Sequence, residues 1–182
     1  FIVFLIWVSI IFVSGLPFLF AVLGTVFATF FLPLFWFFLA AYQKARLVSF
    51  LNPMLDPLGT GYSIIQSQIA IGSGQFFGRG FGRGTQSHLA FLPERQTDFI
   101  FATLSEELGL FGASILLLVF FILIIHILDV AKISGKRFPT QISIGVATWI
   151  LVQIFINVGM NLGLVPVTGI TLPLISYGGS SL

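Results

Sequence analysis

The sequence predicts an all-α, polytopic integral membrane protein, and its composition carries most of that prediction. Hydrophobic residues make up 57% of the 182 residues and charged residues only 8%, whereas about a quarter of a typical soluble domain is charged. Long apolar runs alternate with polar segments that contain glycine or proline. We find neither a β pattern nor an internal repeat. We therefore expect residues 1–182 to form a single membrane domain, a helical bundle fragment with one large loop.

Apolar runs and helix breakers define the expected spans. They are about 1–14 (partial), 18–41, 99–128, 141–165 and 174–182 (partial). Pro33 should kink the second span, because proline removes a backbone hydrogen bond. Residues 43–97 form a polar, glycine-rich loop that is much longer than a usual connection. Because the chain lacks an initial methionine and both ends fall in apolar runs, we expect a fragment of a larger protein.

Basic residues suggest which side of the membrane each loop faces. The short loop 129–140 carries Lys132, Lys136 and Arg137, and the positive-inside rule places such a loop in the cytoplasm. Counting spans then places the 43–97 loop outside the cytoplasm. The basic residues of that outer loop are Lys44, Arg46, Arg79, Arg83 and Arg95. We interpret them as ligands for an anion, while simple solvation of the loop stays open as the alternative.

Asp98 is the carboxylate at the end of the large loop, directly before a long apolar run. Thr97 followed by Asp98 is typical of a helix start, where a hydroxyl caps free N–H groups and an acid is favoured by the helix dipole. A carboxylate at the membrane edge can also act on a lipid-borne substrate, and ionisable groups there are functional candidates by default. The residues alone leave both roles open.

Four motifs, in order and spacing, resemble one known family. They are residues 61–74 (GYSIIQSQIAIGSG), 92–101 (LPERQTDFIF), 106–109 (EELG) and 173–180 (PLISYGGS). Together they resemble the SEDS family of bacterial cell-wall polymerases, whose branches are RodA, FtsW and SpoVE, with the rod-shape branch RodA closest. The resemblance extends over essentially all 182 residues. It would correspond to roughly the second half of a ten-span family member.

The resemblance implies a peptidoglycan glycosyltransferase that polymerises lipid II at the outer leaflet of the bacterial cytoplasmic membrane. It implies a role in cell elongation and shape, with cell division served by the sister branch. It also implies that Asp98 is the essential carboxylate and that a class B penicillin-binding protein is the transpeptidase partner. No cofactor is required, although a divalent cation remains open. A net charge of +2 is too small to indicate nucleic acid.

The chemistry of such a reaction fits these residue types. Extending a glycan on a polyprenyl diphosphate needs a base for the attacking sugar hydroxyl, and Asp98 suits that role. It also needs cations for the departing diphosphate, and Arg79, Arg83 and Arg95 are candidates because guanidinium groups bind phosphate oxygens in pairs. Direct displacement inverts the anomeric carbon and requires no second carboxylate. The other substrate-binding candidates are Glu94, Thr97, Gln66, Ser67, Gly178, Gly179 and Ser180.

Further polar residues lie inside apolar runs. Glu106 and Glu107 follow Asp98 by about 12 Å of helix, a depth within the hydrocarbon if the helix starts at the surface, so both should face protein or a wet cavity. Asn157 and Asn161 lie on one helix face, where a role in contacts between helices is favoured over direct contact with substrate.

The histidines and the glycine–arginine tract do not indicate a further kind of site. His88 and His126 are far apart in the sequence, so we expect no histidine metal site. The glycine–arginine tract 78–84 lacks the context of a dinucleotide site and suits a diphosphate cradle or a flexible loop. Two rival functions stay open: a flippase or transporter for a lipid-linked precursor, which needs a polar cavity but no base, and a membrane scaffold.

Overall fold

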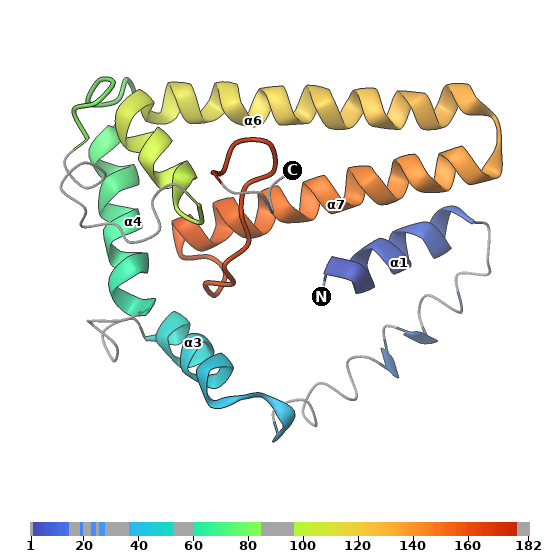
Figure 1. The fold of residues 1–182 in the computed structure, drawn as a ribbon, viewed down its shortest axis with the longest axis horizontal. Coiled ribbons are helices and arrows are strands. Elements are labelled where there is room, and N and C mark those ends of the chain that lie inside the picture. Colours follow the sequence, from blue (N-terminus) through green and yellow to red (C-terminus); the bar gives the residue numbers. More distant parts are fainter. Residues whose placement is uncertain are drawn as a thin grey trace. The chain divides into compact units, whose positions relative to one another are not determined.

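The computed structural model describes residues 2–14, 19, 23–24, 26–27, 37–52, 60–84 and 97–177. The helices in these ranges are α1 (Ile2–Val13), α3 (Ala41–Leu51), α4 (Thr60–Gly74), α6 (Ile100–Ser134) and α7 (Arg137–Leu162) (Figure 1). The all-α prediction is confirmed for this part of the chain. Most of the expected span at 18–41, including Pro33, and most of the one at 174–182 lie outside the described residues.

Helices α6 and α7 are long enough and apolar enough to cross a membrane, by length and composition. They overlap the expected spans 99–128 and 141–165 but have different ends. Helix α6 continues to Ser134, and α7 already begins at Arg137, because Pro139 lies in its first turn, where a backbone N–H has no helical partner to lose. Helix α7 ends at Leu162 rather than Val165.

The end of α7 is fixed by a glycine. Gly163 has a φ of 73°, a backbone conformation that glycine adopts without steric cost. The N–H of Leu164 donates to the carbonyl of Gly159 at 2.8 Å, the bond that closes many helix ends. The chain therefore leaves the helix here and continues as the irregular segment 163–177.

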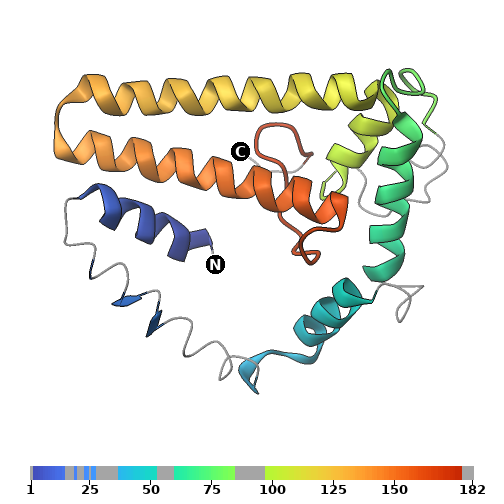
Figure 2. The ribbon, with the colours of Figure 1, turned by 180° about the vertical axis from the view of Figure 1, so that it is seen from behind.

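The chain divides into two compact units, of which the first comprises residues 1–44 and 121–152. It contains α1, the last part of α6 and the first part of α7. Helix α1 lies alongside α7 (Figure 2). The hydroxyl of Thr140 donates to the carbonyl of Ala131 at 3.0 Å and so ties the start of α7 to the end of α6.

The second unit comprises residues 45–120 and 153–182. It contains most of α3, all of α4, the first part of α6 and the last turns of α7, with α4 alongside the start of α6 (Figure 1). Ala70 of α4 and Ala102 of α6 are fully buried, and a Cβ at Gly74 would overlap the carbonyl of Ser105. Small residues thus let the two helices approach closely. The core of the unit consists of Ile64, Ala70, Phe99, Ala102, Met160 and Val167.

The region 43–97, expected as a polar loop, contains most of α3 and all of α4. Helix α4 is rich in serine and glutamine, which gave the segment its loop-like polarity, yet it buries Ile64 and Ala70 against its neighbours. Packing, rather than strong hydrophobicity of the segment itself, therefore stabilises this helix. Residues 53–59 and 85–96 of the predicted loop lie outside the described residues.

Helix α6 is interrupted at Gly109, which has φ 68° and ψ −167°. In an unbroken helix the N–H groups of residues 110 and 111 would bond the carbonyls of residues 106 and 107. Instead, the turn after α4 takes up all four groups. The bonds run from Leu110 N–H to Gln75 O (2.8 Å), Phe111 N–H to Phe76 O (3.1 Å), Arg79 N–H to Glu106 O (3.0 Å) and Gly80 N–H to Glu107 O (3.0 Å). The turn thereby supplies the hydrogen-bond partners that the helix lacks at its break.

Candidate functional site

Asp98 lies in the turn 97–99 directly before α6, and its side chain is half-buried. Its main-chain carbonyl accepts hydrogen bonds from two asparagine side chains of α7. The Nδ2 atom of Asn157 lies 3.0 Å from this oxygen and that of Asn161 lies 3.1 Å from it. Both asparagines are fully buried. The start of α6 is therefore attached to α7 through the backbone of Asp98.

The same asparagines bond other parts of the site. Asn157 Nδ2 also donates to the carbonyl of Ile170 at 2.8 Å. The side-chain oxygen of Asn161 accepts from the N–H of Ala102 at 3.2 Å, one of the first-turn donors of α6 that have no partner within the helix. Asn161 thus caps α6 from a neighbouring helix. Sequence reasoning had considered only Thr97 and Asp98 as caps.

Ser176 supplies a second attachment next to Asp98. Its hydroxyl donates to the carbonyl of Thr97 at 2.7 Å and accepts from the N–H of Leu172 at 2.8 Å. Because Ser176 is also buried, these bonds are shielded from competing water. The main-chain carbonyls of Thr97 and Asp98 are therefore both held in place. Segment 163–177 holds that of Thr97, and α7 holds that of Asp98.

Gly169 borders the carboxylate itself. It has a φ of 72°, and a Cβ built on it would lie 3.4 Å from Asp98 Oδ2. The carboxylate of Asp98 therefore lies beside the segment 163–177. Because the Asp98 side chain keeps part of its surface exposed, a ligand can reach it. The arrangement suits a proton acceptor on a fixed main chain, which is what general-base catalysis requires of a side chain.

The other predicted site residues are distributed differently. Arg79 and Arg83 are exposed on the turn after α4, and that turn bonds α6 at Glu106 and Glu107, about 12 Å of helix away from Asp98. The structure therefore does not bring their backbone to the carboxylate. The remaining predicted residues that lie outside the described part of the chain are Glu94, Arg95, Gly178, Gly179 and Ser180.

Ser67 was predicted to bind substrate, and the structure places it between two helices. It is fully buried, and its hydroxyl donates to the carbonyl of Asn161 at 2.8 Å and lies 3.0 Å from that of Ile64. In this structure Ser67 joins α4 to α7 and offers no surface to a ligand. Its neighbour Gln66 is half-buried on the same helix.

Glu106 is fully buried and Glu107 half-buried. Both were expected at hydrocarbon depth only if one continuous helix starts at the membrane surface. The interruption at Gly109 changes that geometry, because α6 changes direction there and residues 100–108 do not continue the line of the rest of the helix (Figure 1). Distance along α6 from Asp98 is therefore not a measure of depth in a membrane.

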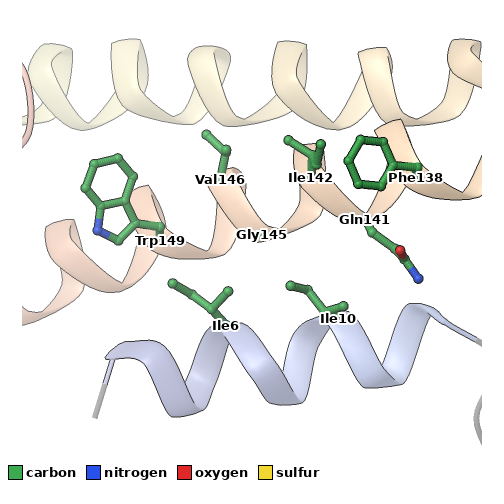
Figure 3. A pocket seen from close by; sticks show the side chains of 8 residues that line it. All are labelled: Ile6, Ile10, Phe138, Gln141, Ile142, Gly145, Val146 and Trp149. Atoms are coloured by element: carbon green, nitrogen blue, oxygen red, sulfur yellow. The ribbon is translucent and has the colours of Figure 1, made fainter.

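A separate groove lies between α1 and α7 within the first unit (Figure 3). Its volume is about 460 Å³, and its lining residues are Ile6, Ile10, Phe138, Gln141, Ile142, Gly145, Val146 and Trp149. Gln141 is the one polar side chain of this lining, and none of the lining side chains can act as an acid or base. The groove therefore offers space for apolar chains but no catalytic group.

Sequence reasoning missed Gly169 and Ile170 as neighbours of Asp98. Both lie in an irregular segment whose sequence carries no periodic signal. Ser176 was noticed only as part of a family motif. One feature that could have drawn attention to the segment is Gly163, a helix terminator that turns the chain toward a new path after α7.

Comparison with known proteins places the chain in a family. A family described as cell cycle protein, named for FtsW, RodA and SpoVE, matches residues 1–182. The peptidoglycan glycosyltransferase MrdB of Escherichia coli is 48% identical over 95% of this chain and 47% of its own length. A probable peptidoglycan glycosyltransferase FtsW of Neisseria gonorrhoeae is 41% identical over 96% of this chain and 38% of its own length.

A solved structure is also similar. It is described as "Structural coordination of polymerization and crosslinking by a peptidoglycan synthase complex", with a TM-score of 0.78 and 31% identity over 100% of this chain and 49% of that chain. This chain thus spans about half the length of the relatives that it matches. The motifs, the family match and the shared fold agree, and the chain belongs to the FtsW, RodA and SpoVE family, the SEDS family that its sequence resembles.

Proposed function

We propose that the protein containing this chain is a peptidoglycan glycosyltransferase that polymerises lipid II into glycan strands, with Asp98 as the general base. The observation that carries the proposal is the fixation of Asp98. Two buried asparagines hold its main chain, and its side chain is half-exposed beside Gly169. The names of the similar proteins support the reaction class.

In the proposed reaction, the carboxylate of Asp98 takes the proton from the attacking hydroxyl of one sugar. The oxygen of that hydroxyl forms a bond to the anomeric carbon of the other sugar. The bond from this carbon to the diphosphate breaks, and the polyprenyl diphosphate leaves with the electron pair. A single displacement of this kind inverts an α-linked sugar phosphate into a β-linked glycan. No covalent intermediate on the protein is needed.

The departing diphosphate needs cationic neighbours, and we assign this role to Arg95. It lies three residues before Asp98 in the sequence, and this closeness along the chain makes it the preferred candidate to bind the leaving group. Guanidinium groups bind phosphate oxygens through two parallel hydrogen bonds. Arg79 and Arg83 are less suited, because their turn joins α6 farther along the helix.

We also propose that the reaction takes place at the outer leaflet of the bacterial cytoplasmic membrane and that a class B penicillin-binding protein is the partner. The basic loop 129–140 supports the orientation, since its lysines and arginine favour the cytoplasm. The similar structure is that of a synthase complex that coordinates polymerisation with crosslinking, and this supports a crosslinking partner.

A polymerisation assay with labelled lipid II on the purified full-length protein tests this function. We expect glycan strands that are digested by a muramidase. Movement of lipid II across vesicle membranes without any polymer would instead identify the protein as a transporter. Absence of both activities, in a protein that still binds its partner, would identify a scaffold.

A further inference from the structure

The turn between α4 and α6, residues 75–84, combines exposed phenylalanine with arginine, and we call it the aromatic turn. The side chains of Phe76, Phe77 and Phe81 are 70%, 87% and 85% exposed. Arg79 and Arg83 are exposed between and after them, and the turn contains no aspartate or glutamate. Three large apolar rings on a cationic surface are unusual for a turn that faces only water.

The aromatic turn holds these rings outward through its backbone. Four hydrogen bonds to the interrupted part of α6 fix its main chain. A Cβ at Gly78 would overlap the carbonyl of Glu107, and Gly78, Gly80 and Gly82 all have positive φ values, which few other residues adopt. The exposure of the phenylalanines therefore belongs to a fixed local structure.

The bonds to α6 also indicate the level of the aromatic turn relative to a membrane. It is joined to α6 where residues 110–134 begin, the part of the helix after the break. At 1.5 Å per residue this part is about 37 Å long, enough to cross a hydrocarbon layer of about 30 Å. Leu110 and Phe111, the first residues of this part, are 56% and 65% exposed. The exposed apolar surface thus continues from the aromatic turn onto the spanning part of α6.

We propose that the aromatic turn binds the surface of a bilayer that contains anionic phospholipids. The rings of Phe76, Phe77 and Phe81 enter the boundary between head groups and acyl chains, as aromatic side chains of interfacial segments do. The guanidinium groups of Arg79 and Arg83 bind lipid phosphates, which a negative membrane surface concentrates. This lipid contact fixes the level of the break in α6 relative to the membrane surface. The proposal does not depend on the reaction proposed above.

The lipid phosphate is favoured over the diphosphate of a glycan substrate for two reasons. The aromatic turn bonds α6 about 12 Å of helix away from Asp98, and its arginines alternate with exposed apolar rings. A site for the leaving group would instead gather cations close to the base. A bilayer surface binds apolar rings and cations together, because its acyl chains accept the rings and its anionic head groups bind the cations.

Depth measurements on the full-length protein test the proposal. In a background without other cysteines, Phe77→Cys carries an environment-sensitive fluorophore in phosphatidylcholine vesicles with or without phosphatidylglycerol. We expect quenching by lipids with nitroxide-labelled chains and protection from iodide. Lys136→Cys, at an exposed position in a polar loop, is the matched control and should show the reverse. Quenching at position 77 by iodide alone would overturn the proposal, as would quenching by neither agent, which indicates cover by protein.

The charge requirement is tested with Arg83. Using nitroxide-labelled phosphatidylglycerol or phosphatidylcholine as quencher near position 77, we expect the preference for phosphatidylglycerol to fall about fivefold in Arg83→Gln, since one basic residue near an anionic surface contributes roughly 1 kcal/mol and about 1.4 kcal/mol is a tenfold change. Arg83→Lys should keep most of the preference, and high salt should remove it. An unchanged lipid preference in Arg83→Gln, with a raised KM for lipid II in both kinds of vesicle, would assign Arg83 to the substrate instead.

Discussion

Asn157 and Asn161 hold Asp98 by its main-chain carbonyl, and these two bonds do not involve its carboxylate. The amide groups of both side chains donate to the same carbonyl oxygen. Because asparagine carries no charge, this attachment does not add a cation that would pair with the carboxylate. A base that is fixed in position is what proton transfer requires. The two asparagines are therefore positioning residues for the proposed reaction.

Replacing Asn161 should separate its structural role from a catalytic effect. Asn161→Ala leaves the Asp98 carbonyl with one partner fewer and the Ala102 N–H with none from this side chain. We expect a loss of about 1–3 kcal/mol in the free energy of unfolding and a lower kcat with little change in KM. Thermal unfolding and steady-state polymerisation assays measure both.

Gln153→Leu is the matched control, because Gln153 lies on the same helix and its buried Oε1 has no hydrogen-bond partner among the described residues. Gln153→Leu should keep kcat within about twofold of the parent, because the Oε1 atom that it removes accepts no hydrogen bond within the described part of the chain. A parental kcat in Asn161→Ala would show that Asp98 does not need this attachment.

Gly169→Ala should disturb the carboxylate directly. The φ of 72° strains any residue with a side chain, at a cost of about 1–2 kcal/mol, and the new Cβ would lie 3.4 Å from Asp98 Oδ2. We expect a modest drop in stability and a larger drop in kcat. If glycan synthesis falls only in proportion to the amount of folded protein, the contact with the carboxylate has no functional weight.

At the scale of elements, the interruption of α6 determines where the first part of this helix lies. The four backbone groups that lose their partners within α6 each bond the aromatic turn instead, so the break leaves these polar groups satisfied. Residues 100–108 thereby pack against α4, in the unit that also contains residues 109–120 of α6.

Gly109→Ala tests the packing of the aromatic turn against the break in α6. Position 109 has φ 68°, and an added Cβ would overlap the backbone of Phe76 and Gly78. We expect a loss of stability well above the cost of about 1–2 kcal/mol for positive φ alone, seen as less folded protein in detergent extracts. Gly135→Ala is the control, since Gly135 has φ 59° with open space around its Cβ position. Equal losses for the two variants would mean that the close packing at Gly109 contributes nothing.

Some elements were predictable from the sequence because their signal is local. The apolar runs predicted α6 and α7, and the spacing of Asn157 and Asn161 predicted that they share a helix face. The break at Gly109 was not predictable, since a glycine inside an apolar run is usually tolerated within a continuous helix. Helix α4 has the composition of a loop, and its helical structure was not predictable because its stability comes from partners that are distant in the sequence.

The candidate site also combines features that could be predicted from the sequence with features that could not. Asp98 could be identified because a carboxylate at the start of an apolar run is rare and is matched by a family motif. Its attachments could not be, because they join residues far apart in the chain, such as Ser176 and Thr97. Arg79 and Arg83 were grouped with Asp98 by charge alone, and only the bonds of the aromatic turn to α6 separate them from it.

At the scale of the whole molecule, orientation in the membrane is a prediction that follows from the basic loop between α6 and α7. Cysteines introduced at Ser87 and Ser134 of the full-length protein should react differently with a membrane-impermeant thiol reagent in intact cells. We expect labelling at position 87 and protection at 134 until the cells are permeabilised. The opposite pattern would invert the topology and place Asp98 on the cytoplasmic side.

The base role of Asp98 is the central claim for the whole molecule, and Asp98→Asn in the full-length protein tests it most directly. The bonds from Asn157 and Asn161 go to the main-chain carbonyl, which this substitution keeps, so the variant should fold, insert and bind its partner. Removing the base should lower glycan synthesis from lipid II by about 10²–10⁴-fold. Near-parental polymer yield at matched expression would contradict the base role of Asp98.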